Sequence, residues 1–230
     1  MRIRIVERTG STNADMLADA NAAEGDWLVG LAQDAGRGRQ GRGWQSLDGN
    51  LFASTLVALR PSDPAAPSLS LAAGVALIRA VEAAAPATGL MLKWPNDLMI
   101  GPAKLAGILL ERSGDRLVAG FGVNLAKAPA IDGRETIALS SVALVSPHSF
   151  APLLAASFAR ALELWRGDLT RLTTAWLESA HPAGTPLRVH VGPGETVEGD
   201  FAGLEPDGAL RLSLADGSVR VMHAADVSLG

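Results

Sequence analysis

Nine residues in the first fifth of the chain combine glycine and arginine in a pattern that suits an anion. The stretch reads Gly36-Arg37-Gly38-Arg39-Gln40-Gly41-Arg42-Gly43-Trp44 and follows an apolar run that resembles a strand. Glycine lets a backbone approach a ligand closely, and arginine offers forked N–H donors that match phosphate oxygens in pairs. The pattern therefore predicts a flexible clamp around a small anionic ligand.

Three other interpretations of this loop compete with the clamp. Gly36, Gly38 and Gly41 match a dinucleotide-binding fingerprint, but residues 43–49 do not begin the helix that this fold requires. Alternating arginine and glycine also occur in nucleic-acid-binding tracts, which usually recur in disordered tails, whereas here there is one copy between strands. A merely solvated basic loop gives no reason for glycine to alternate with arginine. The clamp fits the context best.

The loop is accompanied by other motifs in a fixed order. They are Ser11-Thr12-Asn13, Gln33 before the loop, Lys93-Trp94-Pro95-Asn96-Asp97, Lys104-Leu105-Ala106-Gly107-Ile108-Leu109 and Gly120-Phe121-Gly122-Val123-Asn124. Together they resemble biotin protein ligase, the family that attaches biotin to carboxylases. The nearest enzymatic alternative, a lipoate ligase or octanoyl transferase, shares the catalytic fold but is not expected to carry this glycine–arginine run.

The resemblance implies a reaction in two steps. ATP and biotin form biotinyl-5'-AMP, and biotin then passes to a lysine of a biotin carboxyl carrier protein or domain. This is the work of an acid–amino-acid ligase that forms C–N bonds, with Mg²⁺ bound through the ATP phosphates and no metal held by the protein. A non-catalytic RNA-binding module that uses the same loop is the alternative from a different class of function.

The resemblance also implies roles for individual residues. Lys104, Arg39 and Asp97 are expected to be catalytic, with Lys104 at the biotin carboxylate and α-phosphate and Asp97 orienting the acceptor amine. Biotin is expected to contact Ser11, Thr12, Asn13, Gln33, Gly36, Arg37, Gly38, Arg39, Lys104, Gly107 and Gly120. ATP and the adenylate are expected to contact Arg37, Arg39, Arg42, Trp44, Lys93, Asn96, Lys104, Gly122 and Asn124.

Structural roles for several of these residues stay open. An isolated lysine is usually a solvated charge, and Ser11 and Thr12 would also suit the start of a helix. On a strand, residues 120, 122 and 124 face the same side, so Gly120 and Gly122 would leave bare sheet on which a flat ligand could lie. A close strand crossing would explain the same two glycines equally well.

The elements that position these motifs follow from periodicity and breaker residues. Helices are predicted from Ser11 towards a stop at Gly25, over 70–85, after Ser149, and over 169–179. Strands are predicted at the N-terminus and over 27–33, 51–59, 90–94, 107–111 and 117–125. The helices are too few for strict alternation with strands, so we expect an α+β fold with a mixed central sheet flanked by helices, as in the class II synthetase and biotin-lipoate ligase-like catalytic domain.

A second, smaller domain is predicted at the C-terminus. Residues 181–186 break the helical pattern, and short β-rich runs follow, separated by Gly192-Pro193-Gly194, residues 205–208 and residues 215–217. We therefore expect a catalytic domain over 1–181 and a small SH3-like β-barrel over 182–230. Because Ser11 lies so near the first residue, we also expect the short form of the family, without an N-terminal DNA-binding domain or repressor function.

Composition excludes several classes of function. The net charge of −4 and the pI of about 5.6 lack the basic field that DNA or RNA binding normally needs. There are no cysteines, and the four histidines are far apart, which argues against a protein-built metal site. The N-terminus lacks the apolar run of a signal peptide, and the alanine-rich stretch 69–85 carries charges, so we expect a cytoplasmic protein with no membrane contact. The sequence does not decide between a monomer and a homodimer.

Overall fold

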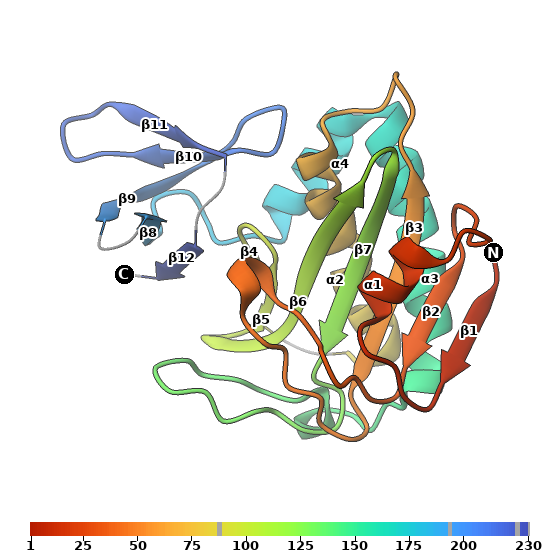
Figure 1. Cartoon of the computed structure of the whole chain (residues 1–230). Coiled ribbons are helices and arrows are strands. Elements are labelled where there is room, and N and C mark those ends of the chain that lie inside the picture. Colours follow the sequence, from red (N-terminus) through yellow and green to blue (C-terminus); the bar gives the residue numbers. More distant parts are fainter. Residues whose placement is uncertain (87–88, 193–194, 224–225, 230) are drawn as a thin grey trace.

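A seven-stranded mixed sheet organises the first half of the chain in the computed structural model, which describes residues 1–86, 89–192, 195–223 and 226–229 (Figure 1). Its strands are β1 (Ile3–Val6), β2 (Trp27–Gly30), β3 (Leu51–Ala58), β4 (Leu90–Lys93), β5 (Asp97–Ile100), β6 (Ala103–Ser113) and β7 (Arg116–Val123). Their order across the sheet is β1-β2-β3-β7-β6-β5-β4. The pairs are antiparallel except β1 with β2, so the sheet is mixed as predicted.

Helices cover both faces of this sheet unequally. The long helices α2 (Leu69–Ala84), α3 (Pro147–Gly167) and α4 (Leu169–Glu178) pack on one face, and the short helix α1 (Thr12–Ala18) lies on the other (Figure 1). Three-residue 3₁₀ turns cover Arg39–Gly41, Ala66–Ser68 and Leu139–Ser141. This arrangement confirms the predicted α+β class.

The main core lies between the sheet and the three long helices. Trp27 of β2, Phe121 of β7 and Phe158 of α3 form an aromatic cluster with ring centroids 5.7 to 5.9 Å apart. Such pairs add to the free energy gained by burying apolar surface. Among the described residues, one helical stretch, Ala66–Ala84, is long and apolar enough to cross a membrane, and it is mostly buried in this core.

Several element boundaries differ from those predicted. The first helix ends at Ala18 with Asp19 as its cap, and Gly25 instead forms the turn before β2 with a φ of +80°. Helix α3 begins at Pro147, because Ser146 and Ser149 form a capping box that places Ser149 inside the first turn. Strand β5 was not predicted, because it follows the turn after Trp94 directly and is only four residues long.

The C-terminal residues form a separate five-stranded antiparallel sheet. Its strands are β8 (Pro186–Gly192), β9 (Glu195–Leu204), β10 (Leu210–Ser213), β11 (Val219–Met222) and β12 (Asp226–Leu229), in the order β11-β10-β9-β8-β12. Within the described part of the chain no ladder joins β11 to β12, so the sheet is open and the expected closed barrel is corrected. The predicted turn at residues 193 and 194 lies outside the described residues.

Trp94 connects the C-terminal sheet to the larger part of the molecule. Its indole Nε1 donates a hydrogen bond of 3.0 Å to the carbonyl of Gly208, in the β9–β10 turn. Gly208 has a φ of +86° and packs against Leu71 of α2, so a side chain there would be both strained and crowded. A residue of the predicted Lys-Trp-Pro-Asn-Asp motif therefore joins the two sheets.

Candidate functional site

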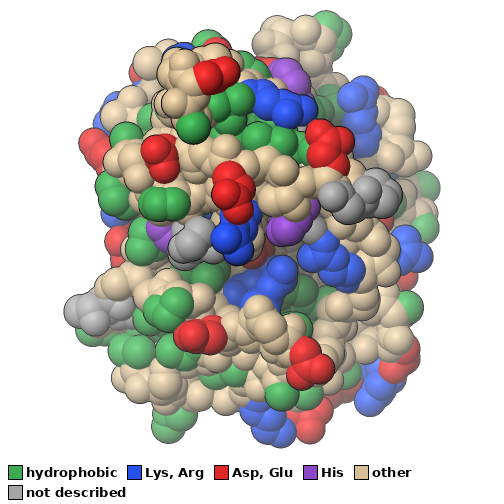
Figure 2. Space-filling model, turned by 90° about the vertical axis from the view of Figure 1, so that its left-hand side faces the viewer, with side chains coloured by type: hydrophobic (Ala, Val, Ile, Leu, Met, Phe, Trp, Pro, Cys, Tyr) green, Lys and Arg blue, Asp and Glu red, His purple; other side chains and the backbone are tan. Residues whose placement is uncertain are grey.

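A cavity of about 430 Å³ opens at one end of β6 and β7, where several loops meet. Its walls come from the start of α1, the glycine–arginine loop, the β4–β5 turn, strands β6 and β7, and the segment after β7. Lys and Arg side chains gather around a hollow in the middle of the face seen in Figure 2. Charge and shape thus favour a small anionic ligand.

Almost all residues singled out in the sequence meet in this cavity. The lining includes Ser11, Thr12, Asn13, Gln33, Arg37, Gly38, Arg39, Arg42, Trp44, Lys93, Asn96, Asp97, Lys104, Gly107, Gly120, Gly122 and Asn124. Gly36 is not part of the lining; its carbonyl accepts a 2.9 Å hydrogen bond from the backbone N–H of Trp44. Gly36 thus closes the base of the loop.

One carboxylate and two ammonium groups form the floor of the cavity. Lys104 Nζ lies 2.5 Å from Asp97 Oδ1, and Lys93 Nζ lies 3.5 Å from Asp97 Oδ2. All three side chains are at most 12% exposed. Burial lowers the pKa of the Lys104 ammonium, and the Asp97 carboxylate opposes this shift. Two cations on one anion leave a positive charge with which a phosphate oxygen could pair.

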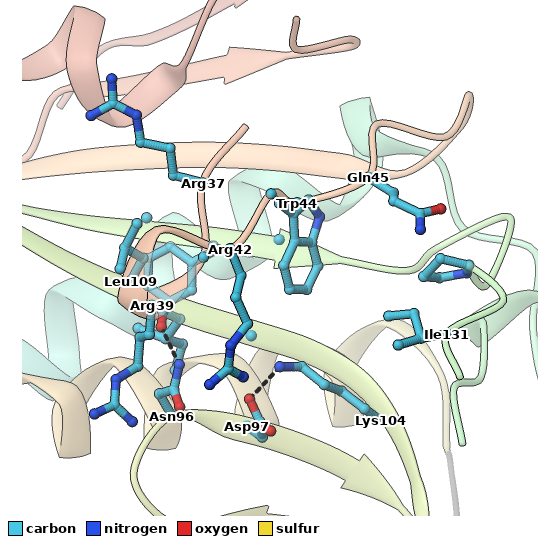
Figure 3. A pocket seen from close by; sticks show the side chains of 18 of the residues that line it. Arg37, Arg39, Arg42, Trp44, Gln45, Asn96, Asp97, Lys104, Leu109 and Ile131 are labelled. Atoms are coloured by element: carbon cyan, nitrogen blue, oxygen red, sulfur yellow. Dashed lines mark hydrogen bonds and ion pairs between the residues drawn. The ribbon is translucent and has the colours of Figure 1, made fainter. Parts of the chain in front are cut away.

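The three arginines of the loop point in different directions (Figure 3). Arg39 and Arg42 reach toward the Asn96 and Asp97 side of the cavity, while Arg37 points the opposite way. Burial lowers the pKa of Arg39, nearby Asp97 raises it, and Arg42 lowers it. Only two of the three arginines therefore join the cationic side of the cavity in this structure.

Trp44 covers a pair of glycines on neighbouring strands. Gly107 of β6 and Gly122 of β7 are direct partners in the ladder, and the Trp44 ring lies over both. A Cβ at Gly107 would be 2.9 Å from Trp44 Cζ3, and one at Gly122 would overlap the ring. Lys104 Nζ lies 5.4 Å from the ring centroid, within the range of a cation–π contact. The glycines thus let an aromatic plane lie flat against the sheet.

Asn13 occupies the corresponding space at Gly120. A Cβ at Gly120 would overlap the Asn13 carboxamide, which makes glycine necessary there. The bare strip of sheet expected over Gly120 and Gly122 is therefore covered by Asn13 and Trp44 in this structure. Two side chains, and not the crossing strand that was the alternative, therefore require glycine at both positions.

The end of the cavity away from Lys104 and Asp97 is polar but carries less charge than the floor they form. Gln33 Oε1 accepts hydrogen bonds from the Thr12 backbone N–H at 2.8 Å and from the Thr12 hydroxyl at 3.0 Å. Ser11 caps α1, with a longer bond of 3.5 Å from the Ala14 N–H to its hydroxyl. Because this end offers amide and hydroxyl groups, it suits a neutral ring with both donors and acceptors.

Two asparagines fasten the loops around the cavity. The Asn96 amide donates to the Ile108 carbonyl at 2.6 Å, which holds the β4–β5 turn against β6. The buried Asn124 amide donates to the carbonyls of Lys104 and Ile137 at 3.4 and 3.3 Å. In this structure both side chains support the walls of the cavity.

Sequence reasoning missed one wall of the cavity entirely. Pro129, Ile131, Arg134 and Thr136, which follow β7, line it together with Gln45 and Val227 of β12. The backbone N–H of Lys104 donates to the Glu135 carbonyl at 2.9 Å, which fixes this segment beside β6. The Asp132-Gly133 pair is typical of a turn, but no local signal in the sequence places such a turn at the cavity.

The described residues contain no group of three or more His, Cys, Asp or Glu side chains that could hold a metal ion. Both oxygens of Asp97 are paired with lysines.

Family comparisons match both parts of the chain. The model of the biotin/lipoate A/B protein ligase family matches residues 4–126, and that of the biotin protein ligase C-terminal domain matches residues 186–230. The chain belongs to the biotin/lipoate A/B protein ligase family. The first match holds the motifs around the cavity, and the second holds the five-stranded sheet.

Individual members of this family are similar along nearly the whole chain. The biotin–[acetyl-CoA-carboxylase] ligase of Paracoccus denitrificans is 40% identical and covers 98% of this chain and 100% of its own length. The enzyme of the same name from Mycobacterium tuberculosis is 33% identical over 98% of this chain and 88% of its own. The Aquifex aeolicus biotin protein ligase with biotin and ATP covers 100% of this chain and 99% of its own with a TM-score of 0.88, and at 21% identity it supports the fold.

Proposed function

We propose that this protein is an ATP-dependent biotin protein ligase that uses the cavity described above. The observation that carries the proposal is that Lys104 lies in one cavity with Arg39 and Arg42 of the loop. These cations face a polar end formed by Thr12 and Gln33. The full-length similarity to biotin–[acetyl-CoA-carboxylase] ligases supports the choice of biotin as the acid.

In the first step, a carboxylate oxygen of biotin attacks the α-phosphorus of ATP, and pyrophosphate leaves. The phosphoryl oxygens carry the charge that develops, so fixed cations lower the barrier. We assign to Lys104 the contact with both the biotin carboxylate and the α-phosphate, and to Arg39 and Arg42 contacts on the phosphate side. Trp44 provides a flat surface for the adenine, and any Mg²⁺ would enter on the ATP phosphates.

In the second step, the neutral amine of a carrier lysine attacks the carbonyl carbon of biotinyl-5'-AMP, and AMP leaves. The product is an amide, and the amine loses its proton in the same step. Asp97 is the residue we propose to orient this amine. Its carboxylate lies on the cavity floor, already paired with two lysines.

The mixed anhydride must be kept from water until the carrier arrives. The loop is well suited to this, because Gly38, Gly41 and Gly43 make its backbone adaptable while its arginines bind the ligand. We propose that it closes over the adenylate. The segment that carries Pro129 and Ile131 forms the facing wall.

Two further assignments are part of the proposal. We place the boundary between a catalytic domain and a C-terminal domain at residues 181 and 182, just before β8 begins at Pro186. The acceptor is a biotin carrier protein or domain of a carboxylase, as the names of the relatives suggest. We propose no nucleic-acid partner, since the net charge of −4 works against phosphate-backbone binding.

A labelling reaction tests this function. Purified protein is incubated with ATP, magnesium, biotin and an apo carrier domain, and the carrier mass and pyrophosphate release are measured. We expect one biotin on the carrier, with activity lost in Lys104→Ala and kept in Lys127→Ala, whose lysine is 59% exposed and paired with Asp48. Labelling with lipoate alone would favour a lipoate ligase, and salt-sensitive RNA binding without labelling would favour the binding module.

A further inference from the structure

Ser54 introduces a hydroxyl into a strand that is otherwise buried and mostly apolar. It lies in the middle of β3, is fully buried, and faces the same side of the sheet as Gly120 of β7, its partner in the ladder. A buried hydroxyl is costly unless it is hydrogen-bonded. Its partners therefore indicate why the strand tolerates it.

Ser54 is the buried centre of a polar network made of Thr12, Ser54, Asn13 and Glu111, of which the Glu111 side chain is 25% exposed. Ser54 Oγ lies 2.7 Å from Thr12 Oγ1 and 2.6 Å from Asn13 Oδ1. The Asn13 amide donates to Glu111 Oε2 at 2.8 Å and to the Leu109 carbonyl at 3.3 Å. The network thus runs from the Gln33 end of the cavity, beneath its wall, to β6.

The carboxylate of Glu111 fixes the direction of this network. It only accepts hydrogen bonds, so the NH₂ group of Asn13 must face it and the Asn13 carbonyl must face Ser54. Ser54 then directs its one hydroxyl proton toward the oxygens of Asn13 and Thr12, while Thr12 donates its own proton to Gln33. Reversing the amide would bring two acceptor oxygens together at the Asn13–Glu111 contact.

Glu111 also contacts the glycine–arginine loop with its second oxygen. Oε1 lies 3.6 Å from Arg37 Nη1, while Oε2 accepts from Asn13. Glu111 and Ser54 are not among the residues that line the cavity. One carboxylate outside the cavity therefore holds both a wall of its polar end and the first arginine of the loop.

We infer that Glu111 is a positioning residue that prepares the polar end of the cavity for the ureido ring of biotin. This inference rests on the proposed function, which places that ring beside Thr12 and Gln33. By fixing the Asn13 amide and, through Ser54, the contact of that amide with Thr12, Glu111 sets the orientation of two residues that line the cavity. Pre-arranged polar groups bind more tightly because they need not reorganise.

Biotin binding to Glu111→Leu, Glu111→Gln and Ser54→Ala tests the inference by titration calorimetry, independently of catalysis. We expect biotin affinity to fall roughly tenfold to a hundredfold in Glu111→Leu, the range for losing a buried bond to a charged group. The biotin affinity of Ser54→Ala should fall less than that of Glu111→Leu. Glu111→Gln should recover part of the loss, because its carbonyl can still accept from Asn13. Glu82→Gln, which removes the exposed ion pair with Arg79, is the matched control and should bind as the wild type.

A structural role alone would give a different pattern. Kinetics of pyrophosphate release should show a raised KM for biotin with the KM for ATP within about twofold, and circular dichroism should show a folded variant. Unchanged biotin affinity in folded Glu111→Leu, or an equal rise in both KM values, would overturn the inference. Wild-type protein that binds biotin but labels no carrier would defeat the proposed ligase function while leaving this inference standing, and wild-type protein that binds no biotin would defeat both.

Discussion

The indole of Trp44 occupies the space that a side chain at Gly122 would need, although the two residues are separated by most of the central sheet in sequence. The same ring lies over Gly107, the ladder partner of Gly122, and within 5.4 Å of the Lys104 ammonium. The loop and the floor of the cavity are therefore coupled through one aromatic contact. Substitutions at the glycines beneath the Trp44 ring should therefore change how the adenylate binds.

Gly122→Ala should weaken ATP binding. The added methyl would push Trp44 off the strand, and overpacking of this kind costs about 1–3 kcal/mol, equivalent to roughly fivefold to 150-fold in the KM for ATP. Steady-state pyrophosphate release checks the KM, and tryptophan fluorescence reports the displaced ring. Gly167→Ala is the control, because no heavy atom lies within 4 Å of its Cβ position and it lies at the end of α3, outside the cavity lining. Equal KM values in the two variants would contradict this view of Trp44.

Arg39→Gly should release biotinyl-5'-AMP early. Arg39 reaches into the cavity beside Asp97, and losing a charge-assisted contact to phosphate costs about 1.5–3 kcal/mol, so adenylate dissociation should rise roughly tenfold or more. Freed adenylate should modify lysines indiscriminately, which mass spectrometry of a bystander protein can measure. Arg8→Gly, which removes an exposed pair with Asp34, should leave target selectivity intact. Unchanged adenylate retention in Arg39→Gly would refute the closing role of the loop.

Asp97→Asn should move the alkaline limit of activity to lower pH. Burial lowers the pKa of Lys104 and Asp97 counteracts it, so removing the carboxylate should lower that pKa further. If charged Lys104 is the active form, activity is present below this pKa and is lost as pH rises through it. Profiles of kcat/KM for ATP against pH compare the variant with wild type and with Asp34→Asn as a surface control. If the alkaline decline of kcat/KM occurs at the same pH in Asp97→Asn and in the wild type, Lys104 is not the titrating group.

Trp94→Phe should loosen the C-terminal sheet. It keeps a ring but deletes the 3.0 Å bond from Nε1 to the Gly208 carbonyl, a loss of about 1 kcal/mol or roughly fivefold in an opening equilibrium. Faster cleavage within residues 181–186 by a broad-specificity protease measures this. Thr55→Val is the matched control, since it loses a 2.9 Å side-chain bond to the Asp26 carbonyl within the larger sheet. If both variants are cleaved equally fast, Trp94 has no special part in docking.

The sequence alone determined which chemistry the chain carries and its fold class. The glycine–arginine loop can be found without coordinates, because it is defined by residue type and local spacing. The same holds for polar motifs that begin or end apolar runs. The α+β class was predicted because the helices are too few to alternate strictly with the strands. The family was predicted from the order of the motifs along the chain. Strand β12 was missed because four residues among turn signals give too short a pattern.

Only the tertiary structure decided how these residues face one another. The register of β3, β6 and β7 places Asn13 over Gly120 and Trp44 over Gly122, and it brings Arg37 to Glu111 instead of to the Asp97 side of the cavity. Contacts of this kind join residues distant along the chain, and a shift of one residue in register would turn each side chain to the other face. Local sequence does not specify this strand register, because the register depends on packing across the whole sheet.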